Sequence, residues 1–396
     1  TPPPKKSRKK SKKSAACGRG RRRRYKHRNR ARYLALRRGK MWAMNNPDAT
    51  PNDWHRITRC GIYPISKRSH VEVYQSTEHG TAHYGGLQQC GSVWACPVCS
   101  AKIAERRREE IEAGFEYAYE TGRKIIMVTL TFPHGLGDDL KELLNRQSEA
   151  LRKLRAGNPW SKIKRRVGFA GMIRSLEITY GKSGWHPHTH EAWIVDKDTD
   201  AEAFRDEVSQ RWAKCCRKAG LLMPGVENEA HFARHAVHII DWAKSSSYLE
   251  KHDDYESRWG LDREMAGGSS KTPAGKHPFM LLEDSSEGDD KAGELYLDYV
   301  EATKGKAQIM WSRGLKEAAG VIERDDDEVV EEQEDDAVCV LLIDHDQWRK
   351  VVEEEAQPEI LDLIEDEGYP GAARWFTDRG LRRPHMPAPT PPESPP

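Results

Sequence analysis

Three histidines within five residues form the group in this sequence that is best suited to chemistry. They are His186, His188 and His190, and a strand is predicted around them. Alternate side chains of a strand lie on one face, so the three imidazoles point the same way and two of them can bind one divalent ion. Glu177, on the preceding predicted strand, could add an oxygen ligand. A mixed nitrogen and oxygen set with open positions favours Mg²⁺ or Mn²⁺ that also holds a phosphate. The alternative is a set of surface histidines beside a sheet edge.

Four cysteines form a second group. Cys96 and Cys99 make a Cys-x-x-Cys motif, Cys90 lies six residues before it, and Cys60 lies further upstream. Tetrahedral Zn²⁺ takes four thiolate or imidazole ligands, and a Cys-x-x-Cys turn presents two of them. In an intracellular chain this clustering predicts a structural zinc site rather than a disulfide or a redox motif. A histidine could replace Cys60 as the fourth ligand, the candidates being His70, His79 and His83.

A tyrosine with lysines on both sides is a candidate nucleophile. Lys244 lies four residues before Tyr248 and Lys251 three residues after it, so all three share one face of a helix predicted from Arg234 to Lys251. Neighbouring ammonium groups favour phenolate over phenol, which suits attack on a phosphate. The alternative is a tyrosine that packs its ring against the sheet.

Length and composition limit the class of protein. The chain has 396 residues, of which 37% are hydrophobic and 32% charged, which is enough for two or three domains. No run approaches the roughly 18 to 20 apolar residues that span a bilayer, so a membrane-embedded protein is excluded. The N-terminal residues lack the apolar region of a secretory signal. We therefore expect a cytoplasmic protein.

The two ends of the chain carry opposite charge. Residues 1–40 contain 19 Lys and Arg and no Asp or Glu, whereas residues 321–368 contain 20 Asp and Glu and 3 Lys and Arg. A basic segment of this kind is predicted to be disordered without a partner and to suit a polyanion, because contacts with phosphates release condensed counterions. The alternative is a tail that pairs with the acidic block of the same chain.

The predicted elements indicate an α+β fold with an antiparallel central sheet covered by helices. Two strands, 168–180 and 185–195, are joined by four turn residues and predict a hairpin. The other predicted strands are 124–131 and 337–343, and the predicted helices are 101–121, 138–157, 201–219, 231–251 and 348–364. The predicted domains are a disordered basic arm (1–50), a zinc knuckle with a basic helix (51–122), a domain bearing the histidines (123–320), an acidic α/β region (321–383) and a Pro-rich tail (384–396).

Four segments follow one another in an order and spacing that match a known family. They are Cys90–Cys99 with the Arg-rich helix after it, Met127–Thr131, Trp185–His190 and Tyr248–Lys251. Together they resemble the rolling-circle replication initiators of bacterial plasmids, within the HUH endonucleases. The resemblance covers about residues 55–320. Its His-x-His element is specific in this context, whereas the Cys-x-x-Cys motif and the single tyrosine are not.

The resemblance implies an HUH-type fold and a role for each matching residue. His188 and His190 match the pair that holds a catalytic Mg²⁺ or Mn²⁺, and Glu177 lies where a further ligand could come from. Tyr248 matches the nucleophile and Lys251 the lysine that follows it. The implied activity is metal-dependent, site-specific nicking and closing of single-stranded DNA at a replicon origin, through a 5′-phosphotyrosyl intermediate. The implied partners are single-stranded or extruded origin DNA and a host helicase and polymerase. The candidate DNA contacts are Arg106, Arg107 and Lys244.

The sequence departs from the family pattern at two positions. Thr189 stands where most members have a bulky apolar residue, and Lys244 stands where small Gram-positive members have a glutamate. The second departure leaves the water-activating carboxylate open between Glu264 and Asp241, and Tyr255 is an alternative nucleophile. Two other functions stay open, namely a non-catalytic zinc-knuckle DNA-binding regulator and a three-histidine Zn²⁺ hydrolase. The oligomeric state is also open.

Overall fold

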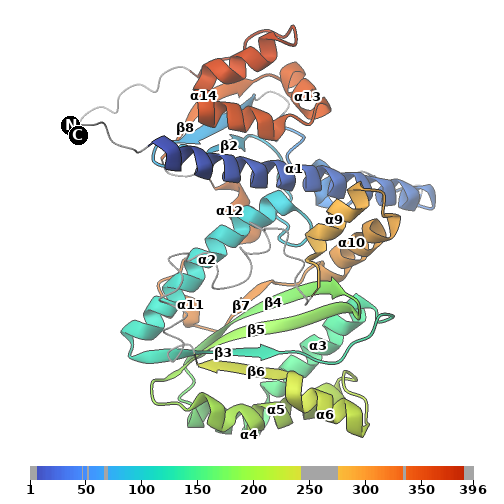
Figure 1. Ribbon diagram of the computed structural model, residues 1–396, viewed down its shortest axis with the longest axis vertical. Helices are drawn as coiled ribbons and strands as arrows, with labels where there is room; N and C mark the ends of the chain where they lie inside the picture. Colours follow the sequence, from blue (N-terminus) through green and yellow to red (C-terminus); the bar gives the residue numbers. More distant parts are fainter. Residues whose placement is uncertain are drawn as a thin grey trace. The chain divides into compact units, whose positions relative to one another are not determined.

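The computed structural model of the protein describes residues 7–46, 48–50, 53–66, 70–241, 275–332 and 336–387; within these ranges the side chains of 7–19 and 226–228 are not described. The chain divides into two compact units, Thr1–Lys102 with Asp325–Pro396, and Ile103–Arg324 (Figure 1). The predicted N-terminal knuckle and acidic C-terminal region therefore form one unit instead of two. The reason is strand pairing between β1 (Val71–Ser76) and β8 (Ala337–Ile343).

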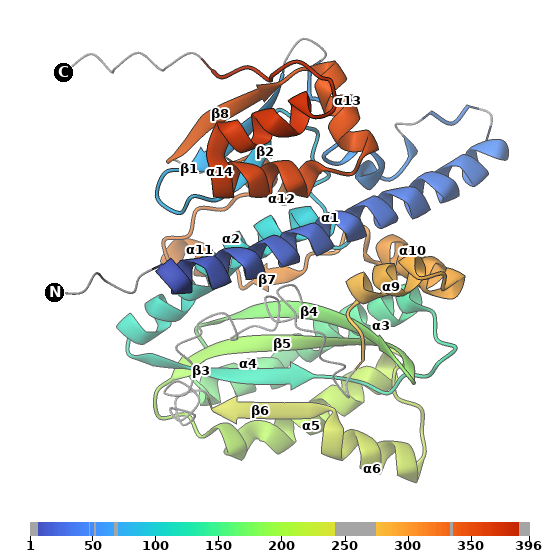
Figure 2. The ribbon, with the colours of Figure 1, turned by 45° about the horizontal axis from the view of Figure 1, so that its top comes forward.

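The second unit is built on a five-stranded antiparallel sheet with the order β6-β3-β5-β4-β7. Its strands are β3 (Arg123–Leu130), β4 (Gly171–Gly181), β5 (Gly184–Asp196), β6 (Val237–Asp241) and β7 (Ile309–Trp311). Figure 2 shows β4, β5, β3 and β6 side by side. The prediction of an α+β fold with an antiparallel sheet covered by helices is confirmed.

The two faces of β5 have different surroundings. Trp193 is fully buried on one face, where its indole packs against Trp160 of α4 (Gly157–Arg166) and Phe204 of α5 (Ala201–Lys218). On the other face Ala192 and Ile194 join a core that includes Ile111, Phe115 and Ala118 of α2 (Pro97–Glu120). His186, His188 and His190 continue this second face toward the start of β5.

The β4–β5 hairpin turns within four residues. Gly181 pairs with Gly184, and the register continues with Thr179 opposite His186 and Glu177 opposite His188. Gly184 has a φ of +86°, and a Cβ there would lie 2.8 Å from the carbonyl oxygen of Gly135. Only glycine meets both demands without strain. The predicted hairpin is confirmed.

The predicted helix over 231–251 is confirmed over 231–235 and is wrong over 237–241. Helix α6 (Val226–His235) ends early and β6 follows it at Val237. Val237 and Ile239 are buried while His238 and Ile240 are exposed, a period of two that fits an edge strand on β3. Residues 242–274 lie outside the described residues. The other helices described in this unit are α3 (Leu140–Leu154), α9 (Pro278–Ser286), α10 (Asp290–Thr303) and α11 (Leu315–Ala318).

The first unit contains a three-stranded antiparallel sheet, β2-β1-β8, in which β2 is Ala82–Gly85. Its core includes Val73, Leu341 and Trp348, all buried. The predicted helix 348–364 is instead two helices, because Pro358, in the first turn of the second helix, has no amide hydrogen to donate to a preceding turn. The further elements are η2 (Arg56–Arg59), α12 (Asp326–Glu331), α13 (His345–Glu353) and α14 (Gln357–Thr377).

The N-terminal basic segment is helical, which corrects the prediction of a disordered arm. Helix α1 covers Ser7–Met44, and its buried residues Tyr25, Arg28, Ala31 and Ala35 follow one another at intervals of three or four residues. Arg21 and Arg22 pair with Asp362 of α14 at 2.9 and 2.8 Å. The interpretation that the basic segment pairs with the acidic block of the same chain therefore holds for these residues. In the part of the chain that is described, no helix combines the length and apolar character that crossing a membrane requires.

Candidate functional site

A carboxylate and two imidazoles meet on the open part of the β5 face. Glu177 Oε2 lies 3.1 Å from His188 Nε2 and 3.0 Å from His190 Nε2. The three residues form a group whose ligand atoms all lie within 4.8 Å of one another. The structure therefore brings together the three residues that the sequence predicts as a metal group. The three residues meet because the hairpin register places Glu177 directly opposite His188.

A hydroxyl from the neighbouring strand holds the other nitrogen of His190. Thr129 of β3 pairs with His190 in the sheet, and its Oγ1 lies 3.1 Å from His190 Nδ1. When Nδ1 carries the proton and donates to this oxygen, Nε2 has a free lone pair on the side of Glu177. The sequence alone does not indicate this role for Thr129. The role depends on the pairing of β3 with β5, which places Thr129 opposite His190 and which the sequence does not specify.

The third histidine has a different partner. His186 Nδ1 lies 2.6 Å from His134 Nε2, and His134 Nδ1 lies 3.1 Å from the carbonyl oxygen of Ser183. Burial lowers the pKa of His186 to about 4 and also lowers the pKa of His134, so the pair is neutral near pH 7. His186 is not part of the metal group. A three-histidine Zn²⁺ site therefore lacks its third ligand in this arrangement.

The electrostatics of the group keep Glu177 ionised. Burial alone would raise the pKa of Glu177, but hydrogen bonds that the Nε2–H groups of His188 and His190 donate to it hold that pKa below its usual value. Burial lowers the pKa of His277, the N-cap residue of α9, to about 4, and the negative charge of Glu177 offsets only part of this effect. Once the proton of each imidazole lies on Nδ1 instead of Nε2, the group offers an ionised carboxylate and two imidazole lone pairs, a set that fits Mg²⁺ or Mn²⁺.

The histidine face is accessible at this point. The side chains of His188, His190 and Glu177 are 12%, 31% and 28% exposed. His238 of β6 pairs with Thr129 and is exposed on the same face. A ligand from solution can therefore approach the group.

The four predicted cysteines lie together in the first unit and are buried. Sγ of Cys60 is 3.7 Å from Cys96 and 3.5 Å from Cys99, and Sγ of Cys90 is 3.7 Å from Cys99. Four sulfurs at the usual Zn–S length of about 2.3 Å form a tetrahedron with an edge of about 3.8 Å. The cluster therefore fits a four-thiolate zinc ion. Cys60 completes the set, so the predicted alternatives among histidines are not needed.

The other predicted site residues are placed less favourably or lie elsewhere. Arg107 is largely buried and pairs with Glu110 at 2.6 Å, so it is a poor phosphate contact, whereas Arg106 is 29% exposed beside Glu109. Asp241 pairs with Lys124 at 2.8 Å. Asp241 lies opposite Ile126, which itself lies opposite Trp193. Asp241 is therefore on the Trp193 face of the sheet, and the histidines are on the other face. The remaining predicted site residues lie outside the described residues, namely Lys244, Tyr248, Lys251, Tyr255 and Glu264.

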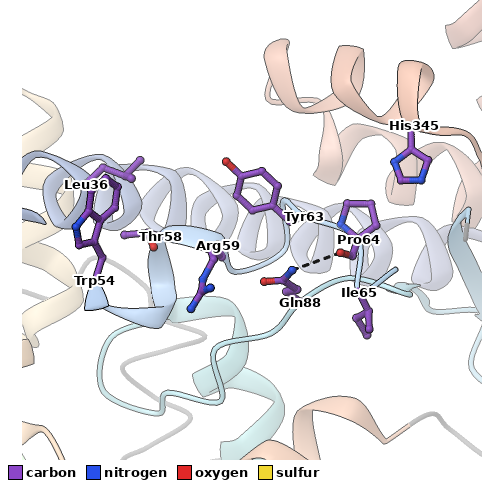
Figure 3. Close-up of a pocket in the computed structure, with 9 residues that line it drawn as sticks. All are labelled: Leu36, Trp54, Thr58, Arg59, Tyr63, Pro64, Ile65, Gln88 and His345. Carbon is purple, nitrogen blue, oxygen red and sulfur yellow. Dashed lines mark hydrogen bonds between the residues drawn. The ribbon is translucent and has the colours of Figure 1, made fainter. Parts of the chain in front are cut away.

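A pocket of about 490 Å³ lies in the first unit, and none of the four cysteines is among its lining residues (Figure 3). Trp54 and Tyr63 supply aromatic walls, and Arg59 is the arginine among the nine lining residues. Gln88 Nε2 donates to the carbonyl oxygen of Pro64 at 3.4 Å. The other lining residues are Leu36, Thr58, Ile65 and His345.

Known proteins resemble this chain in sequence. Residues 87–220 match the family Rep_1, described as "Replication protein". A protein named Protein rep from Streptomyces lividans is 28% identical over 308 residues, which cover 63% of this chain and 67% of that protein. Protein rep from Staphylococcus aureus is 33% identical over 125 residues, or 30% of this chain and 50% of that protein. A "Neomycin resistance protein" from Streptomyces cyanogenus is 32% identical over 155 residues, or 33% of this chain and 36% of that protein. No solved structure matches.

The matched segment contains the Cys-x-x-Cys motif, α2, β3 and the histidine strand β5. The resemblance to replication proteins of the Rep family is therefore confirmed. The chain spans about two thirds of the Streptomyces lividans relative and half or less of the other two.

Proposed function

We propose that the protein initiates rolling-circle replication as a metal-dependent, site-specific nicking and closing enzyme of the HUH type. The observation that carries the proposal is the Glu177, His188 and His190 group on an accessible sheet face, within a chain similar to replication proteins. The antiparallel sheet, with its histidine pair on a central strand, agrees with an HUH-type domain. Single-stranded or extruded origin DNA is the proposed substrate.

The chain's own groups have distinct tasks in this proposal. His188, His190 and Glu177 would hold Mg²⁺ or Mn²⁺, which when bound supplies a positive charge that polarises a phosphate oxygen. Thr129 fixes the ring of His190 so that its Nε2 faces the ligand side. The basic residues Lys244, Lys251 and Arg106 are the proposed contacts for the DNA backbone.

Tyr248 is the proposed nucleophile. Its phenolate oxygen would form a bond to the scissile phosphorus while the bond to the 3′ oxygen breaks, which leaves a free 3′-hydroxyl and a 5′-phosphotyrosine. The 3′ end can then prime a host polymerase beside a helicase. Attack by a 3′-hydroxyl on the same ester would reseal the strand without ATP, because the ester retains the energy of the broken bond.

Chain connectivity allows this tyrosine to reach the histidines. Asp241 lies opposite Ile126, which lies opposite Trp193, three residues from His190. Two strand spacings and three residues along a strand amount to about 14 Å between Asp241 and His190. Tyr248 follows Asp241 by seven residues, which can span up to about 25 Å. The linker is therefore long enough for the proposed attack.

The test uses the full chain with single-stranded oligonucleotides that carry the origin, in the presence of Mn²⁺. We expect a covalent protein–DNA adduct that survives denaturation, that Tyr248→Phe abolishes, and that the matched variant Tyr255→Phe retains. An adduct that persists in Tyr248→Phe would assign the nucleophile elsewhere. Binding of origin DNA without any adduct would favour the non-catalytic regulator.

A further inference from the structure

An arginine lies fully buried in the first unit. Arg28 of α1 is 2% exposed, and neither its Nε nor its Nη2 has a hydrogen-bond partner among the described residues. Its guanidinium lies over the ring of Tyr25, 4.3 Å from the ring centre. A buried charge is normally paired or hydrogen-bonded, because its desolvation is costly. The position of Arg28 therefore calls for a negative group that compensates it.

The cysteine cluster lies beside this guanidinium. Burial would lower the pKa of Arg28, but the fields of Tyr25, Cys60, Cys96 and Cys99 raise it. Gly61, next to Cys60, has a φ of +62°, and a Cβ there would lie 2.2 Å from Arg28 Nη1. The absence of a side chain at Gly61 thus leaves room for the guanidinium directly against the segment that carries Cys60.

The charge of the cluster explains the need for a cation. Four thiolates around Zn²⁺ carry a net charge of −2, and the four cysteines are buried. Arg56 also interacts electrostatically with Cys90 and Cys99. Its guanidinium, however, is paired with Asp327 at 2.8 Å, and this carboxylate offsets its charge. Among the described residues, no carboxylate forms an ion pair with Arg28. It would reduce the net charge of the buried zinc group to −1.

We infer that Arg28 is the buried counter-charge of a four-thiolate zinc site, and that helix α1 is thereby a structural part of that site. Arg28 does not bind the metal itself. The zinc group provides the negative partner that the guanidinium needs, and the guanidinium in turn lowers the cost of burying a charged zinc group. The inference rests on zinc at the cysteine cluster and is independent of the nicking activity.

The experiment measures zinc affinity of the full chain by competition with a chelator. Arg28→Met keeps most of the apolar stem and removes the charge, and Arg28→Gln is a second neutral variant in case the first does not fold. We expect a 10- to 100-fold loss of zinc affinity, the usual range for a group that supports metal ligands. Arg28→Lys, which keeps the charge, should lose less. Arg22→Met is the matched control, because Arg22 is on the same helix but 63% exposed.

Thermal unfolding with and without zinc separates this role from simple packing. If Arg28 acts through the zinc group, the neutral variants lose stability mainly in the zinc-loaded protein. Equal losses in the loaded and metal-free protein, together with unchanged zinc affinity, would overturn the inference. A wild-type chain that takes up no zinc would overturn it as well. Neither measurement uses DNA, so failure here is distinct from failure of the proposed nicking activity.

Discussion

Removal of one hydroxyl from β3 should weaken metal binding on β5. Thr129 Oγ1 lies 3.1 Å from His190 Nδ1, while His190 Nε2 lies on the side of Glu177. In Thr129→Val the ring loses the partner that selects its protonated nitrogen, and the fraction of His190 with a free Nε2 lone pair falls. Valine is also β-branched and suits a strand, so the sheet should be retained.

The expected size follows from measured effects of such supporting hydrogen bonds. Loss of one typically lowers metal affinity about 10- to 100-fold, which corresponds to roughly 1.4 to 2.7 kcal/mol. Mn²⁺ titration of the full chain, followed by electron paramagnetic resonance of the free ion, measures this affinity directly. Thr129→Ser is the matched control, because serine keeps the hydroxyl, and it should bind Mn²⁺ close to the wild-type affinity.

Two results would refute this reasoning. Thr129→Val could bind Mn²⁺ as tightly as the wild type, which would mean that Thr129 does not orient His190. Alternatively, His190→Ala could leave Mn²⁺ affinity unchanged, which would mean that the ion binds elsewhere.

Two further predictions concern the stability of the two units. Arg155 pairs with the fully buried Glu191, so Arg155→Met should lower the free energy of unfolding of the second unit by about 3 to 5 kcal/mol in urea unfolding. The double variant Arg155→Met, Glu191→Gln should regain part of this loss. If it regains none, the unpaired Glu191 charge is not the cause. Burial lowers the pKa of His27 to about 4, so below about pH 6.5 the unfolded chain binds more protons than the folded chain. The free energy of unfolding should therefore fall as the pH is lowered from about 6.5 to about 4. The slope due to this residue is up to about 1.4 kcal/mol per pH unit. His27→Gln should reduce that slope, and an unchanged slope between about pH 6.5 and 4.5 would contradict the assignment.

The sequence predicts that Glu177, His188 and His190 lie close together because this grouping is local. His188 and His190 alternate on one strand, and a four-residue turn brings Glu177 opposite them. Both relations depend on strand period and hairpin length, which short stretches of sequence specify. The cysteine cluster is similarly marked by the Cys-x-x-Cys spacing, although the inclusion of Cys60 depends on contacts 36 residues away.

The sequence does not predict the parts that depend on distant pairing. β1 pairs with β8 across more than 260 residues, so the two ends of the chain could not be assigned to one unit. The basic character of α1 hides its buried positions, because Tyr25 packs in a core with residues of α14 and Arg21 pairs with Asp362 of the same helix. The strand β6 was missed since Val237–Asp241 has a helix before it and forms its backbone hydrogen bonds with β3.

The turn at Gly181–Gly184 has a consequence for how the chain can vary. A strand that slips by one residue presents its opposite set of side chains, so one inserted residue in this turn would place Thr189 and Glu191 where the imidazoles now lie. The turn lies about 13 Å from His188, at about 3.3 Å for each of four residues. We therefore expect natural variants to conserve the length of this loop more strictly than its composition at Lys182 and Ser183.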